Sequence, residues 1–83
     1  MDFEVKLKVA PIFNHFYEIN DVRSYEERLY TSACTKHTRD IINGYKSGKK
    51  AVLEYIEKSD KPLETITKEE LMNVFGNVSK LKQ

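Results

Sequence analysis

Apolar and charged side chains alternate strictly along residues 3–9, near the start of the chain. The apolar set is Phe3, Val5, Leu7 and Val9, and the charged set between them is Glu4, Lys6 and Lys8. A period of two residues is typical of a strand with one buried face. The sequence therefore predicts a short N-terminal strand over about residues 3–9.

A strand of this kind needs a neighbour to satisfy its backbone amides and carbonyls. Within the chain, the segment 63–66 is the one plausible mate, and a second copy of the chain is the other candidate. An unpaired strand edge invites pairing with another chain. We therefore expect Phe3, Val5, Leu7 and Val9 to form a partner or dimer edge.

The spacing of apolar residues becomes helical after Pro11, which suits the first turn of a helix and predicts one over about residues 11–19. The sequence Ser24-Tyr25-Glu26-Glu27 has the form of a capping box and predicts a longer helix over about residues 24–43. Its packing side would carry Tyr30, Ala33, Cys34, His37, Ile41 and Tyr45.

The same apolar stripe continues in phase as far as Tyr55, which leaves open a single helix over residues 24–58. Two glycines, Gly44 and Gly48, favour a break instead, because each costs a helix about 1 kcal/mol relative to alanine. A helix of that length would also exceed the diameter of a chain of this size. We therefore expect a break within residues 43–48 and a further helix over about residues 49–58.

The clearest helix start lies near the C-terminus, where Thr67-Lys68-Glu69-Glu70 forms a second capping box. Ile66 and Leu71 stand at the two positions of a hydrophobic staple, and the pattern predicts a helix over about residues 68–78. Residues 79–83 read as a loosely ordered tail. The predicted fold is mainly helical, of the α+β class, in a single small domain over residues 1–83.

Composition narrows the function classes. The chain has 83 residues, 14 basic and 13 acidic side chains and a net charge of +1, so its overall charge attracts neither nucleic acid nor an anionic membrane. A core of this size is small, which makes a homodimer the expected state. The single cysteine, Cys34, fits a reducing compartment, and no apolar run is long enough for membrane insertion. We therefore expect a cytoplasmic protein.

Few residues in the chain could bind a metal or take part in catalysis. Cys34 and His37 would share one face of a helix, close enough to bind a common metal or to form a thiolate-imidazole pair. A zinc site needs three or four ligands, and only His15 remains as a third soft ligand. The glutamates at the predicted helix starts are explained by the helix dipole. We therefore expect no catalytic residues, no cofactor and no metal, with Cys34 and His37 as the only candidates.

The local charge is more informative than the total, because residues 36–50 contain five basic side chains and one acidic one, Asp40. If the helix continues in phase, several of these cations lie opposite the apolar stripe and could contact a nucleic-acid backbone. A solvated helix face is the favoured explanation, because Glu54 and Glu57 interrupt the same side further on. The candidate nucleic-acid residues are Arg28, Lys36, Arg39, Lys46, Lys49 and Lys50.

Three functional hypotheses follow from these patterns. The first is a small non-enzymatic protein-interaction module, such as a regulator, inhibitor or adaptor, that docks onto or occludes a partner protein. The second is a nucleic-acid-binding regulator that uses the basic face of residues 36–50. The third is a metal or thiol site at Cys34 and His37.

Overall fold

The computed structural model describes residues 3–32 and 34–83, and the regular elements within those ranges are all helices. In chain order they are α1 (Phe3–Ile19), α2 (Val22–Arg28), α3 (Lys36–Lys58), the short 3-10 helix η1 (Leu63–Thr65) and α4 (Lys68–Ser79). The molecule measures 46 × 22 × 19 Å and has a radius of gyration of 13.7 Å. A compact chain of this length would have about 12 Å, so the protein is elongated.

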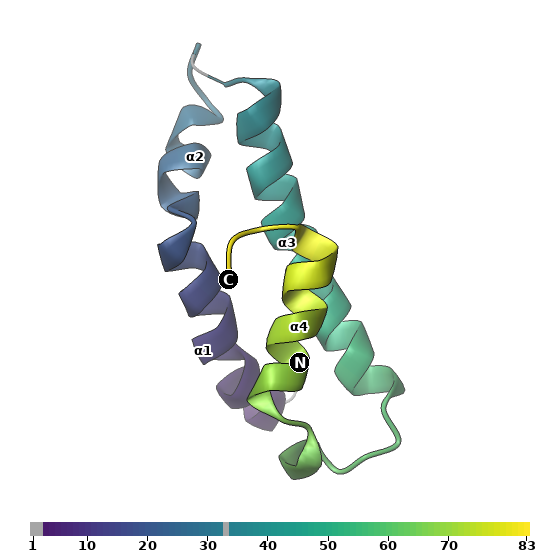
Figure 1. Ribbon diagram of the computed structural model, residues 1–83. Helices are drawn as coiled ribbons and strands as arrows, with labels where there is room; N and C mark the ends of the chain where they lie inside the picture. The colour runs from purple at the N-terminus through teal and green to yellow at the C-terminus, as the bar shows by residue number, and fades with distance from the viewer. Residues whose placement is uncertain (1–2, 33) are drawn as a thin grey trace.

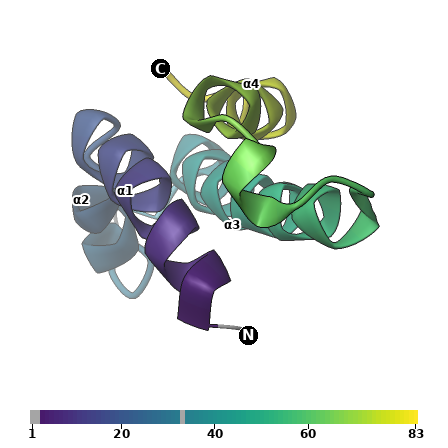
Figure 2. The same cartoon turned by 90° about the horizontal axis from the view of Figure 1, so that it is seen from below.

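Figure 1 shows that α1 and α2 follow one another along one side of the molecule, and α3 runs back beside them. The chain then turns through η1, and α4 packs against the second half of α3. Viewed from below in Figure 2, α1, α3 and α4 stand at three corners of a triangle. The core lies where these three helices meet.

Aromatic rings fill the centre of that triangle. Phe16 of α1 stacks on Phe75 of α4 with 4.1 Å between ring centroids, and Phe13 lies 5.9 Å from the same ring. Tyr45 of α3 meets Phe75 edge-on at 5.7 Å and donates a hydrogen bond of 3.2 Å to the carbonyl of Phe13. One buried cluster therefore joins the three main helices.

The predicted N-terminal strand over residues 3–9, and with it the α+β class, is wrong. These residues are the first turns of α1, which continues through Pro11 to Ile19. At 100° per residue, Val5 and Val9 align with Ile12 and Phe16 on one inward stripe, so the segment satisfies a helical period as well as a strand period. Pro11 lies on the exposed side of the helix, where water can hydrogen-bond to the Leu7 carbonyl that loses its helical donor.

The segment 63–66, the suggested internal mate of that strand, does not pair with residues 3–9 either. Leu63–Thr65 form η1, in which the Ile66 N–H donates to the Leu63 carbonyl. Thr65 closes the same turn through its hydroxyl, which donates to the Pro62 carbonyl at 2.7 Å. This turn delivers Ile66 into the core.

The predicted helices over residues 24–43 and 49–58, with a break within 43–48, are also wrong. The chain leaves the helix after Arg28 and re-enters one at Lys36, so the break comes earlier, and α3 then runs unbroken to Lys58. The cap of α2 is Asp21 in a left-handed conformation, and Ser24 lies inside the helix. Thr35 caps α3 by accepting from the Thr38 N–H at 3.2 Å.

The packing side predicted for residues 30–45 is therefore only half correct. Tyr45 is in the core and Ile41 packs against it, but Tyr30 is 89% exposed in the connecting loop and His37 is exposed on α3. Ala33 lies outside the described residues.

Gly44 and Gly48 are close-packing positions, not turn positions. A Cβ at Gly44 would stand 2.6 Å from the carbonyl oxygen of Ser79, and one at Gly48 would stand 2.9 Å from the ring of Phe75. None of the described glycines has a positive φ. The two glycines therefore allow α4 to approach α3 closely, and this packing compensates for their low helix propensity.

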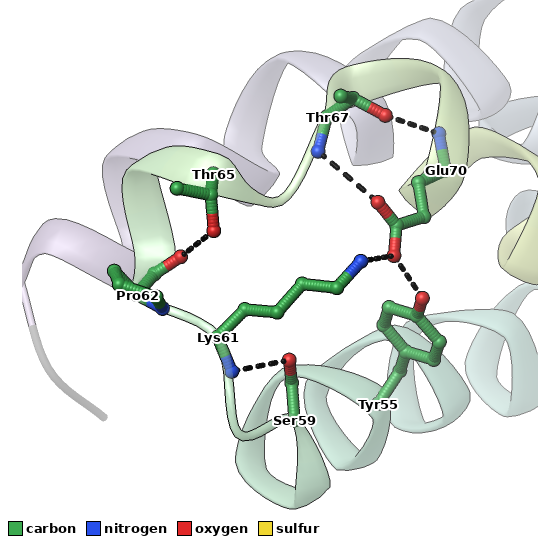
Figure 3. A network of polar contacts seen from close by, with 7 residues as sticks. All are labelled: Tyr55, Ser59, Lys61, Pro62, Thr65, Thr67 and Glu70. Carbon is green, nitrogen blue, oxygen red and sulfur yellow. Dashed lines mark hydrogen bonds and ion pairs between the residues drawn. The ribbon is translucent and has the colours of Figure 1, made fainter.

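The C-terminal helix begins where the capping box predicts. Thr67 accepts from the Glu70 N–H at 3.1 Å while the Glu70 carboxylate accepts from the Thr67 N–H, and α4 runs from Lys68 to Ser79. The staple residues Ile66 and Leu71 are both buried in the same cluster. This reciprocal cap is shown in Figure 3.

Residues 79–83, expected from the sequence to be a loose tail, turn back from α4 toward α1 (Figure 1). Leu81 is buried in the core cluster, and the Leu81 N–H donates to the Ser79 hydroxyl at 3.2 Å. The main chain of Lys82 exchanges hydrogen bonds with the side chain of Asn20. The tail thus bridges α4 and the end of α1.

Candidate interaction surfaces

The four residues predicted as a partner or dimer edge fall on two opposite sides of α1. Residues two apart in a helix differ by about 200°, so Val5 and Val9 point inward while Phe3 and Leu7 point outward. Phe3 is 70% exposed and Leu7 is 61% exposed. The structure therefore keeps half of the predicted edge on the surface and places the other half in the core.

The outward side of α1 continues beyond those two residues. Ala10 and Pro11 are exposed and follow Phe3 and Leu7 at helical spacings. We call Phe3, Leu7, Ala10 and Pro11 the α1 outer face. Ala10 and Pro11 lie beyond the end of the predicted strand, and a helical period applied to residues 3–11 includes them.

Two lysines border the α1 outer face. Lys6 lies on one flank and Lys8 on the other, and Glu4 stands on the same flank as Lys8. Pro11 has no N–H to donate to the Leu7 carbonyl, so that carbonyl lacks its usual helical donor on the exposed side. The surface thus combines two large apolar groups, a main-chain acceptor and a border of two lysines and one glutamate.

The predicted nucleic-acid residues do not form one cluster. Four of them, Lys36, Arg39, Lys46 and Lys50, are exposed on one side of α3, and we call these the α3 basic stripe. The other two interact with tyrosine rings. Arg28, on α2, lies 5.3 Å from the ring centroid of Tyr25, and the Lys49 ammonium lies 4.8 Å from that of Tyr45.

The candidate metal or thiol pair is not arranged as a helical pair. Cys34 is half-buried in the loop before the cap Thr35, whereas His37 is exposed in the first turn of α3. The Nε2 of His37 lies 3.4 Å from the Tyr25 hydroxyl, and the two rings meet edge-on. The described residues contain no group of three His, Cys, Asp or Glu side chains placed to hold a metal ion.

A polar network joins the C-terminal end of α3 to the N-terminal end of α4 (Figure 3). The Glu70 carboxylate accepts hydrogen bonds from the Tyr55 hydroxyl and, at 3.3 Å, from the Lys61 ammonium. The bond from Tyr55 is the largest cause of a Glu70 pKa below its usual value, and the same bond raises the pKa of Tyr55. Each member contacts a partner within the chain, so this network stabilises the fold.

No described helix combines the length and apolar character that crossing a membrane requires. Comparisons of the chain with protein-family models, with curated proteins and with solved structures found no match. Two exposed surfaces, the α1 outer face and the α3 basic stripe, are the candidate interaction surfaces of the described residues.

Proposed function

We propose that this protein is a small non-enzymatic protein-interaction module that docks onto a partner protein through the α1 outer face. The observation that carries the proposal is the exposure of Phe3 and Leu7, one turn apart on a helix whose opposite side is fully engaged in the core. A pair of large apolar groups at this spacing is typical of a helix that binds in a groove of another protein.

The chemistry of the surface specifies the partner. Phe3 and Leu7 would occupy apolar pockets, and burying each contributes about 1.5–3 kcal/mol. Lys6 stands alone on one flank, whereas Glu4 accompanies Lys8 on the other, so acidic side chains are favoured along the rim of the partner's groove that faces Lys6. We therefore propose an apolar groove with an acidic rim as the binding site on the partner.

The test compares two substitutions of an exposed apolar residue by aspartate. Leu7→Asp places a carboxylate where the partner is apolar, and burying an unpaired carboxylate costs several kcal/mol. Val78→Asp is the matched control, because Val78 is also exposed but lies on α4. Circular dichroism first establishes that both variants keep the helical content of the wild-type protein.

A photocrosslinking amino acid placed at Phe3 then identifies what contacts the surface, with the same group at Val78 as its control. We expect a discrete protein adduct from position 3 that survives nuclease and high salt and is lost in the Leu7→Asp background. An adduct unchanged by Leu7→Asp, or equal adducts from both positions, would refute docking through α1.

Sedimentation of the protein alone decides whether the partner is a second copy of this chain, the expected homodimer. A micromolar dimer that Leu7→Asp dissociates and Val78→Asp leaves intact would make the partner another copy. A monomer would assign the α1 outer face to a different protein.

A further inference from the structure

The α3 basic stripe follows the pitch of the helix. Its members Lys36, Arg39, Lys46 and Lys50 are separated by three, seven and four residues, which are close to whole numbers of turns. All four are exposed, and the buried residues of α3, such as Tyr45 and Val52, lie on the opposite side. The stripe is therefore a solvent-facing side of one helix.

The unbroken course of α3 fixes the distances within the stripe. Its four cations form two pairs, Lys36 with Arg39 and Lys46 with Lys50, and the midpoints of the pairs are about 16 Å apart along the axis. Asn43 is exposed midway between them on the same side. A break at residues 43–48 would have destroyed this spacing.

The exposed acidic residues of α3 border the stripe and do not lie between its members on the same side. Asp40 lies toward one flank, and Glu54 and Glu57 come after Lys50, so they end the stripe on its C-terminal side. Four positive charges thus occupy about 21 Å of helix in a chain whose total charge is only +1. Any attraction for a polyanion must come from this surface.

We propose that the α3 basic stripe binds duplex DNA, with α3 lying across the major groove and one cation pair on each phosphate backbone. The major groove is about 12 Å wide, and lysine and arginine side chains extend from pairs about 16 Å apart to its two edges. Asn43 is exposed between the pairs, but a helix that rests on both backbones holds this short side chain above base edges about 8.5 Å deep, so the binding is independent of sequence. This binding is separate from docking through α1.

The same surface disfavours the other nucleic acids. Single strands are held by stacking on exposed aromatic rings, whereas the tyrosines of α3 face the core or α4: Tyr45 is buried and Tyr55 hydrogen-bonds to Glu70. Duplex RNA has a deep, narrow major groove that side chains cannot enter. Duplex DNA is therefore the ligand that the stripe fits.

The test is fluorescence anisotropy of the intact protein with a labelled DNA duplex of mixed sequence at low salt. The stripe variant replaces Lys36, Arg39, Lys46 and Lys50 by glutamine. The matched control makes the same change at four exposed lysines elsewhere, Lys6, Lys58, Lys68 and Lys82. Both variants lose four positive charges, so bulk charge is equal between them.

We expect the stripe variant to lose at least about 100-fold in affinity and the control to stay within about fivefold of wild type. Four neutralised phosphates also predict a slope of about −3.6 for log affinity against log salt. Asn43→Asp should weaken binding more than the same change at Asn77, an exposed residue of α4.

Three results would overturn the proposal. They are the absence of duplex binding by the wild type at low salt, an equal loss in both glutamine variants, and tighter binding to a single strand or an RNA duplex than to DNA. Leu7→Asp should leave duplex binding unchanged, so a failure here is distinguishable from a failure of docking through α1.

Discussion

The side-chain amide of Asn20 pairs with the main chain of Lys82 in the way that one peptide group pairs with another. Its Nδ2 donates to the Lys82 carbonyl and its Oδ1 accepts from the Lys82 N–H, both at 2.9 Å. The same Nδ2 also donates to the Phe16 carbonyl at 3.0 Å, at the end of α1. One asparagine therefore holds the chain terminus against the first helix.

The first prediction follows from this pairing. Asn20→Ala removes all three hydrogen bonds, two of them to the tail, and at about 1 kcal/mol each we expect a loss of about 2–3 kcal/mol in the free energy of unfolding. Urea denaturation measures it. Asn77→Ala, at an exposed position of α4, is the control and should change stability by less than about 0.5 kcal/mol. Equal effects of the two changes would mean that the tail contributes nothing.

The second prediction separates three hydroxyl residues near helix starts. Thr67→Ala and Thr35→Ala each remove an observed cap and should each destabilise the protein by about 1 kcal/mol. Ser24→Ala should stay within about 0.5 kcal/mol, because Ser24 lies inside α2 and caps nothing there. Urea midpoints measured side by side check this order. A Ser24→Ala loss as large as that of Thr67→Ala would place the start of α2 where the sequence pattern put it.

The third prediction concerns the loss of stability at low pH. The Tyr55 hydroxyl, the Thr67 N–H and the Lys61 ammonium hold the Glu70 pKa below its usual value of 4.5. A lowered pKa means that the folded state favours the carboxylate, so this stabilisation is present above about pH 4.5 and is lost as the pH falls through the folded-state pKa. We expect Glu70→Gln to flatten the fall in the urea midpoint on acidification below about pH 5.

Glu69→Gln is the control for that experiment. Glu69 is exposed in the same first turn of α4, and its substitution removes the same charge. It should leave most of the acid dependence in place. If the two glutamine variants give the same pH profile, the Tyr55 hydrogen bond does not set the acid response.

The first helix shows why local pattern did not decide the fold. Phe3, Val5, Leu7 and Val9 alternate as a strand would, yet Val5 and Val9 also begin a helical stripe that Ile12 and Phe16 complete. Both periods fit the same few residues. Contact with Phe75, 59 positions beyond Phe16 in the chain, favours the helix, and no local pattern contains that contact.

The glycines illustrate a different limit. Gly44 and Gly48 read as helix breakers because propensity counts only local cost, whereas their use is to admit Ser79 and Phe75 from α4. The Thr67 cap was predictable because both of its members lie within four residues. The equally local box at Ser24 misplaced the start of α2, so a complete signal within one turn was not sufficient by itself.

For the candidate surfaces too, the sequence shows the residue types, and their arrangement depends on the fold. The sequence predicted Phe3, Val5, Leu7 and Val9 as one partner edge, whereas the helical period leaves Phe3 and Leu7 exposed and turns Val5 and Val9 to the core. It identified the cations of residues 36–50 and made their alignment conditional on a helix that continues in phase, which α3 does through its glycines. The apolar and basic residues are visible in the sequence, but which of them share a surface depends on how the helices pack.

The packing around α3 differs along its length. Its first turns lie beside α2, a helix of seven residues, whereas α4 packs against it from Gly44 onward. The amide hydrogens of α3 should therefore exchange with solvent in two regimes. Those of the first turns should exchange by local opening, and those near Val52 only on global unfolding. A ligand that bridged Lys36 and Lys50 would couple these regimes. Slowed exchange in the first turns of α3 would then report that the helix is occupied, even where the ligand touches no backbone amide.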